Sequence, residues 1–136
     1  MRLLLDPSVL IDVLRLHHGR RELLAELARD GHTLATTALN VAERYAGMPP
    51  EEESRTENFI DAFDCYDLTA AAGRRAGSLK NKYARRGRTS HLADTIVAAI
   101  AIERRCTLMT DNAKDFPCRN CTATTCHNRS QTATSR

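Results

Sequence analysis

Short apolar runs alternate along the chain with longer segments in which apolar residues recur every three or four positions. The runs at 3–5, 33–36 and 107–110 predict buried strands, and 65–68 is a weaker strand candidate. The longer segments predict helices over 8–14, 23–28, 38–46, 51–63, 69–86 and 92–104, with Ser8 as the expected cap of the first. Strands that alternate with helices indicate an α/β fold, in which a mostly parallel sheet is covered by helices on both faces.

The C-terminal segment departs from this pattern. Residues 118–136 contain no Leu, Ile, Val, Phe or Met, and are rich in Thr, Ser, Asn and Arg. A segment of this composition buries too little apolar surface to offset the entropy lost on ordering. We therefore expect one domain over residues 1–117 and a loosely ordered polar tail over 118–136, with a terminal strand in doubt.

Composition narrows the class of protein. A chain of 136 residues with 42% hydrophobic residues suits one domain of ordinary core size. No apolar stretch approaches the ~20 residues that span a bilayer, and Asp6 and Pro7 interrupt the first apolar run too early for a signal peptide. Five cysteines, an odd number, favour reduced thiols over a disulfide framework. These features predict a cytoplasmic protein without membrane association.

Positive charge is concentrated in the second half of the chain. No acidic residue occurs between Leu68 and Ala93. The same stretch contains seven basic residues: Arg74, Arg75, Lys80, Lys82, Arg85, Arg86 and Arg88. Such a block can attract nucleic-acid phosphates, and it also fits an ordinary solvated helix face. Charge alone leaves both interpretations open.

Several acidic residues follow the predicted strands. Asp6 comes directly after the first strand, and Glu43 lies in the helix after the second. Asp94 lies in the first turn of an apolar helix, and Asp111 and Asp115 follow the last strand. Each acid alone also fits a turn, a helix start or a solvated position. Together they predict a carboxylate cluster, because ligands of such sheets bind at the carboxyl ends of the strands.

The surroundings of Asp94 favour a metal site. This acid stands among Leu92, Ala93, Ile96 and Val97, where an uncompensated charge is costly to bury. Mg²⁺ and Mn²⁺ prefer oxygen ligands and retain bound waters, so a few carboxylates around an open cavity suit them. Water bound to such an ion attacks phosphodiesters. The cluster therefore indicates a divalent metal site suited to attack on phosphodiesters.

Four stretches resemble the motifs of a known family. Residues 4–12 (LLDPSVLID) resemble the opening motif of PIN-domain nucleases, in particular VapC-type toxins of bacterial toxin–antitoxin pairs. Residues 37–47, 92–101 and 108–116 resemble the three motifs that follow. All four occur in the family's order, across residues 3 to 117. The resemblance is therefore specific, although each motif alone is only moderately so.

The resemblance implies a three-layer α/β/α sandwich and a metal-dependent endonuclease acting on RNA, frequently tRNA or ribosomal RNA. It also implies a homodimer and inhibition by a small antitoxin. Asp6 and Asp94 match the main metal ligands, and Glu43 completes the ligand set or acts through water. Asp115 would add a fourth carboxylate, whereas Asp111 falls at a variable position. The supporting polar residues would be Asn112 and Ser8.

Two departures from the family pattern favour an alternative function. Pro7 stands where the family has threonine or serine, so a backbone N–H and a hydroxyl are missing beside Asp6. The polar tail stands where the family continues into an apolar terminal strand, which would leave a sheet edge exposed. The alternative is a catalytically weak or inactive PIN remnant that still binds RNA or an antitoxin.

The cysteines of the tail raise a separate alternative. Cys118 and Cys121 have a spacing found in zinc sites, and Cys126 and His127 follow. There is no second pair at typical spacing, and adjacent Cys126 and His127 are poorly placed to bind one ion. The sequence therefore favours the carboxylate site over structural zinc.

Overall fold

The structure is a computed structural model that describes residues 1–14, 19–110 and 123–125. The first half contains β1 (Arg2–Leu5), α1 (Pro7–Leu14), α2 (Arg20–Arg29), β2 (Thr33–Thr37), α3 (Ala38–Ala46) and η1 (Pro50–Glu52). The second half contains α4 (Glu53–Ile60), β3 (Asp64–Tyr66), α5 (Ala70–Arg85), α6 (Leu92–Glu103), β4 (Thr107–Thr110) and β5 (Ala123–Thr125).

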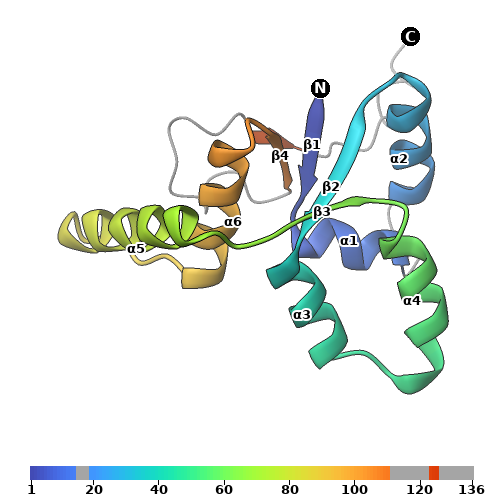
Figure 1. The fold of residues 1–136 in the computed structure, drawn as a ribbon, viewed down its shortest axis with the longest axis horizontal. Coiled ribbons are helices and arrows are strands. Elements are labelled where there is room, and N and C mark those ends of the chain that lie inside the picture. Colours follow the sequence, from blue (N-terminus) through green and yellow to red (C-terminus); the bar gives the residue numbers. More distant parts are fainter. Residues whose placement is uncertain (15–18, 111–122, 126–136) are drawn as a thin grey trace, which may run out of the picture.

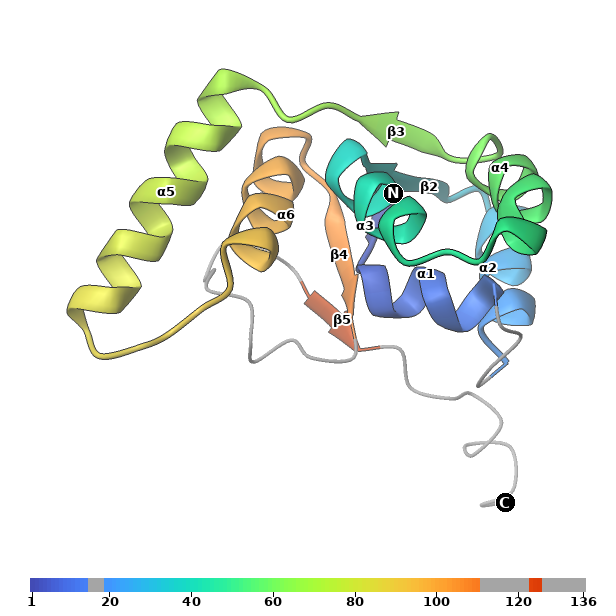
Figure 2. The same ribbon diagram turned by 90° about the horizontal axis from the view of Figure 1, so that it is seen from below.

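The strands form one parallel sheet in the order β3-β2-β1-β4-β5. Helices α5 and α6 lie on one side of this sheet, and α1, α2 and α4 lie on the other (Figure 1). The three-layer α/β/α sandwich implied by the sequence is confirmed. A helix that follows a strand in such a fold begins at the carboxyl edge of the sheet, where α1, α3 and α6 all have their N-terminal ends (Figure 2).

Successive leucine side chains of β1 point to opposite faces of the sheet and belong to two separate core clusters. Leu4 packs with residues of α5, α6 and β4 on one face. Leu3 and Leu5 pack with residues of α1, α2 and Met109 on the other. All three leucines are buried, as expected for a central strand of a parallel sheet that is covered twice. The unbroken apolar run at 3–5 is thus a consequence of burial on both faces.

Two predicted element boundaries were wrong. Helix α1 begins at Pro7, so Ser8 lies inside the helix and not at its cap. Proline suits the first helical position, because the N–H it lacks would have no partner within the helix. The single helix expected over 51–63 is divided into η1 and α4. The helices expected over 38–46, 69–86 and 92–104 match α3, α5 and α6 closely.

The polar tail contributes a strand. Ala123–Thr125 form β5, which pairs in parallel with Leu108, Met109 and Thr110 of β4. The expectation that β4 would be left as an exposed edge is therefore wrong for these residues. Threonine has a branched β-carbon that suits a strand. The lack of large apolar residues therefore led to an underestimate of the tendency of this segment to form a strand. The rest of the tail, with Cys118, Cys121, Cys126 and His127, lies outside the described residues.

Membrane insertion has no support in the described helices. None of them, within 1–14 and 19–110, combines the length and the apolar character needed to cross a bilayer.

Candidate active site at the carboxyl edge of the sheet

Asp6 occupies the junction between β1 and α1. Its carbonyl accepts a hydrogen bond from the N–H of Leu10 (3.1 Å), and its own N–H donates to the carbonyl of Met109 on β4 (2.9 Å). The residue is buried, with 6% of its surface exposed. Its carboxylate Oδ2 accepts a hydrogen bond from the hydroxyl of Thr110 at 2.6 Å. Asp6 is therefore held by the last residues of β4 as well as by its own helix.

Glu43 and Asp94 approach the same edge from two other helices. Glu43 lies on α3, with its side chain exposed, and Asp94 lies half-buried in the first turn of α6. Partial burial raises the pKa of Glu43 above its ordinary value, and the negative charges of Asp94 and Asp6 raise it further. Charges act in this way over short distances only. Three of the four predicted carboxylates therefore lie near enough at this edge for the charges of Asp6 and Asp94 to act on Glu43.

The donor set suits a hard divalent cation in its chemistry. Three carboxylates whose charges repel one another gain stability from a cation placed among them. Within the described residues, however, no three His, Cys, Asp or Glu side chains are close enough to bind one ion together. The predicted fourth ligand, Asp115, and its neighbour Asn112 lie outside the described residues, as does the side chain of Ser8. Asp6, Glu43 and Asp94 thus offer the oxygen donors that such a cation prefers, but within the described residues the three do not by themselves form a metal site.

Two polar residues that the sequence did not single out support the carboxylates. Thr110 donates to Asp6, as described above. Asn40, on α3, is 1% exposed, and its side-chain Nδ2 donates to the carbonyl of Leu5 at 2.9 Å. Nothing in the local pattern of apolar residues marks either one. A buried amide or hydroxyl at the end of a strand becomes informative only once the strand order places it beside an acid.

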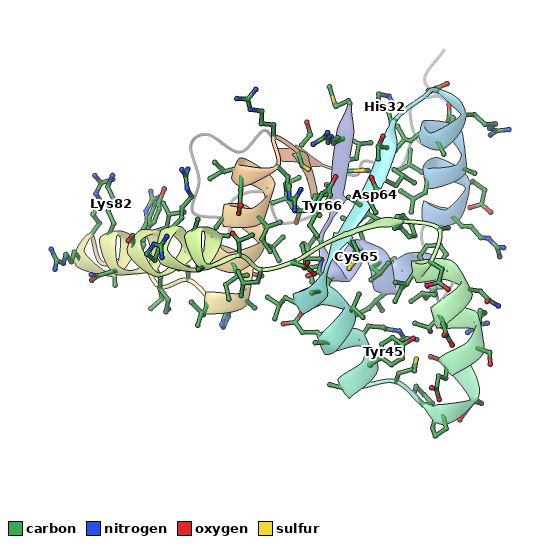
Figure 3. The ribbon with its side chains drawn as sticks, in the orientation of Figure 1. His32, Tyr45, Asp64, Cys65, Tyr66 and Lys82 are labelled. Carbon is green, nitrogen blue, oxygen red and sulfur yellow. The ribbon has the colours of Figure 1, made fainter. Side chains whose placement is uncertain are left out.

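A buried ion pair fixes the other end of α3. Arg44 lies directly after Glu43 and is buried, and its guanidinium donates to Oε2 of Glu52 on η1 at 2.6 Å. The side chain of Glu52 is 25% exposed. Helix α3 is therefore attached to η1 at Arg44 and to β1 at Asn40, and Glu43 lies between these two attachments. Figure 3 shows the neighbouring Tyr45 on the part of α3 that faces α4.

The predicted basic residues divide into two groups. Lys80 donates to the carbonyl of Ser90 and so closes the loop between α5 and α6. Arg88 lies over the ring of Tyr83, 6.0 Å from its centroid. The other five are exposed, and we call them the α5 basic face: Arg74, Arg75, Lys82, Arg85 and Arg86. Lys80 and Arg88 thus have contacts within the chain that account for their positions.

The α5 basic face borders a surface hollow of about 360 Å³. Its lining consists of Ser78, Asn81, Lys82, Arg85 and Arg86. The opposite face of α5 packs on α6 through Ala72 and Ala76, which are buried in the core. Figure 3 shows Lys82 on the part of α5 that extends away from the sheet. This surface offers cations and neutral hydrogen-bonding groups and no apolar side chain.

Comparison with known proteins agrees with this architecture. The family model described as PIN domain matches residues 3–117. Ribonuclease VapC19 of Mycobacterium tuberculosis is 32% identical over 114 residues, which cover 84% of this chain and 91% of that protein. Ribonuclease VapC10 of the same organism is 31% identical over 115 residues, which cover 85% and 86%.

A solved structure shares the fold. The crystal structure of VapBC2 from Rickettsia felis, bound to a DNA fragment from its promoter, superposes with a TM-score of 0.81 at 21% identity, covering 93% of this chain and all of that one. At this identity the likeness speaks for the fold alone. The family match over residues 3–117 and the two mycobacterial relatives also establish the family. This chain belongs to the PIN-domain family, and its relatives there include VapC ribonucleases.

Proposed function

We propose that this protein is a Mg²⁺- or Mn²⁺-dependent endoribonuclease and that it acts in the cytoplasm as the toxin of a toxin–antitoxin pair. The observation that carries the proposal is the placement of Asp6 at the junction of β1 and α1, Glu43 on α3 and Asp94 in the first turn of α6, all at the carboxyl edge of the sheet. The raised pKa of Glu43 supports it, because the charges of Asp94 and Asp6 add to the effect of partial burial. Relatives named ribonuclease VapC support the class of reaction.

In this proposal Asp6 and Asp94 hold the divalent ion, and Glu43 and Asp115 complete the ligand set directly or through water. A bound Mg²⁺ or Mn²⁺ supplies a nucleophilic water and stabilises charge on the phosphate. The chain's own side chains hold the proposed metal ligands in position. Thr110 holds the carboxylate of Asp6 in one orientation by donating a hydrogen bond to its Oδ2. Asn112 is proposed as a further polar neighbour.

The α5 basic face is proposed to bind the RNA backbone. Contacts between exposed arginines and phosphates give affinity and salt dependence without base specificity. Ser78 and Asn81, which line the hollow beside them, can donate hydrogen bonds to phosphate or ribose oxygens. All seven basic residues are proposed to contribute, with Lys80 and Arg88 also contacting their own chain. We propose tRNA or ribosomal RNA as the substrate class.

Cleavage of labelled RNA by the full chain, with Mg²⁺, with Mn²⁺ and with EDTA, tests the proposal. Asp94→Asn keeps the size of the side chain and removes its charge, so cleavage should fall at least a hundredfold. The matched control is Asp30→Asn, an exposed acid that precedes β2 at the opposite edge of the sheet. Cleavage that persists in EDTA, or that both variants retain, would refute the metal-dependent mechanism.

The second candidate is a PIN remnant that binds RNA or an antitoxin without cleaving. Pro7 favours it, because a hydroxyl is missing beside Asp6 where the family has threonine or serine. Binding measured by fluorescence anisotropy, with no cleavage in either metal, would select this function. A small cognate antitoxin and a homodimer are proposed for both functions. Co-purification with the neighbouring gene product and light scattering test these two assemblies.

A further inference from the structure

A single buried side chain connects two of the elements that carry the carboxylates. Asn40 lies in the first turn of α3, three residues before Glu43 and therefore on a neighbouring part of the same helix face. Its Nδ2 donates to the carbonyl of Leu5, the residue directly before Asp6, at 2.9 Å. The contact spans 35 positions of sequence. It therefore sets how the α3 carboxylate lies relative to the β1 carboxylate.

The local structure keeps Asn40 in this position. Its backbone N–H donates to the hydroxyl of Thr37, the N-cap of α3, at 3.1 Å. The residue is 1% exposed, so water does not compete for its amide. Arg44 attaches the next turn of α3 to Glu52. With both attachments in place, the stretch of α3 that carries Glu43 is fixed relative to β1 and η1.

The other half of the Asn40 amide gives an independent argument. Its Oδ1 is buried and has no hydrogen-bond partner within the described residues. An unmet buried acceptor costs free energy, and an apolar side chain of the same size would avoid that cost. The amide therefore combines one buried hydrogen bond, which joins α3 to β1, with one unmet acceptor. A role in placing the carboxylates explains its presence better than a role in folding.

We infer that Asn40 is a positioning residue of the carboxylate centre, which orients Glu43 toward Asp6 and thereby sets the affinity of that centre for a divalent cation. The inference rests on the proposed metal-dependent function. Outer groups that orient metal ligands typically change metal affinity by tenfold or more. The effect should pass through Glu43, because Asn40 itself contacts a backbone carbonyl and lies on the same helix as that glutamate.

Titration of the full chain with Mn²⁺ alone, followed by electron paramagnetic resonance, tests the inference. Asn40→Leu should weaken Mn²⁺ binding about tenfold, and urea unfolding of the same variant verifies that it is folded under the conditions of the titration. In a Glu43→Gln background the same substitution should change the affinity less than twofold, because the residue through which it acts is already neutral. Thr36→Val, which removes another buried hydroxyl without a partner among the described residues, should leave Mn²⁺ affinity unchanged.

Each result has a defined meaning. Unchanged Mn²⁺ affinity in Asn40→Leu, or an equal loss in both backgrounds, would overturn the positioning role while leaving the nuclease proposal intact. Failure of the unsubstituted chain to bind Mn²⁺ would overturn the metal centre and the inference with it. If Asn40→Leu does not fold, Asn40→Ser replaces it, since its side chain is one bond shorter and loses the contact with Leu5. The same tenfold loss is expected there.

Discussion

The hydrogen bond from Thr110 to Asp6 allows a direct test of how the site is built. Thr110 is fully buried at the end of β4, and Asp6 is 6% exposed. Their oxygen atoms lie 2.6 Å apart, a length typical of a hydroxyl that donates to a charged acceptor. Thr110→Val keeps the shape of the side chain and removes the donor. A buried carboxylate then loses a partner that water cannot easily replace.

The expected cost follows from the type of bond. Hydrogen bonds to charged groups contribute about 1.5–3 kcal/mol, and here the acceptor remains in place after the donor is removed. We expect Thr110→Val to lower the free energy of unfolding at neutral pH by about 2 kcal/mol. For a chain of this size, that corresponds to a fall of roughly 5–10 °C in Tm. Urea unfolding with an unchanged slope gives the free energy directly.

A second buried threonine provides the control. Thr36, on β2, is also fully buried, but its hydroxyl has no hydrogen-bond partner within the described residues. Thr36→Val makes the same chemical change and should be neutral or slightly stabilising, because it removes an unmet polar group. Equal effects of the two substitutions would show that the Thr110 hydroxyl does not stabilise Asp6.

Two further predictions concern charge. Glu43→Gln should stabilise the fold at pH 7. Because the folded state raises the pKa of Glu43, ionisation of this side chain at pH 7 opposes folding. In urea unfolding, the gain in free energy of unfolding caused by Glu43→Gln should disappear as the pH falls below the ordinary glutamate pKa. A gain that persists at acid pH would contradict this prediction. Reversing the charges of Arg85 and Arg86 should weaken RNA binding most at low salt and reduce the salt slope of log Kd by about two, whereas the same change at Arg21 and Arg29 of α2, also exposed, should not.

The sheet and most helices were predictable because their signals are local. The apolar runs at 3–5 and 107–110 are β1 and β4, and Thr69 caps α5 through its hydroxyl, at the predicted start of that helix. The failures have physical causes. Ser8 resembles a cap, but Pro7 is a better first residue of a helix. β5 has no apolar run, and its pairing with β4 requires knowledge of the sheet.

Only the charged residues of the candidate site were predictable from the sequence. Acids that follow strands are visible in the sequence, and strand order then gathers Asp6, Glu43 and Asp94. Asn40 and Thr110 were not predictable, because each acts through one hydrogen bond to a residue 35 or 104 positions away. Lys80 has a contact that its charge does not reveal. It belongs to the basic block in sequence, yet it donates to the carbonyl of Ser90.

The placement of the three carboxylates also explains why Glu43 bears the cost of bringing them together. Asp6 stands directly before α1, and Asp94 lies in the first turn of α6, where the positive end of a helix dipole stabilises negative charge. Glu43 is the sixth residue of α3, beyond the reach of that effect. Partial burial raises the pKa of Glu43 most, and the charges of Asp94 and Asp6 raise it further. A cation bound at this edge should therefore lower the pKa of Glu43, and that is why Glu43→Gln reports both on the repulsion and on the ion that relieves it.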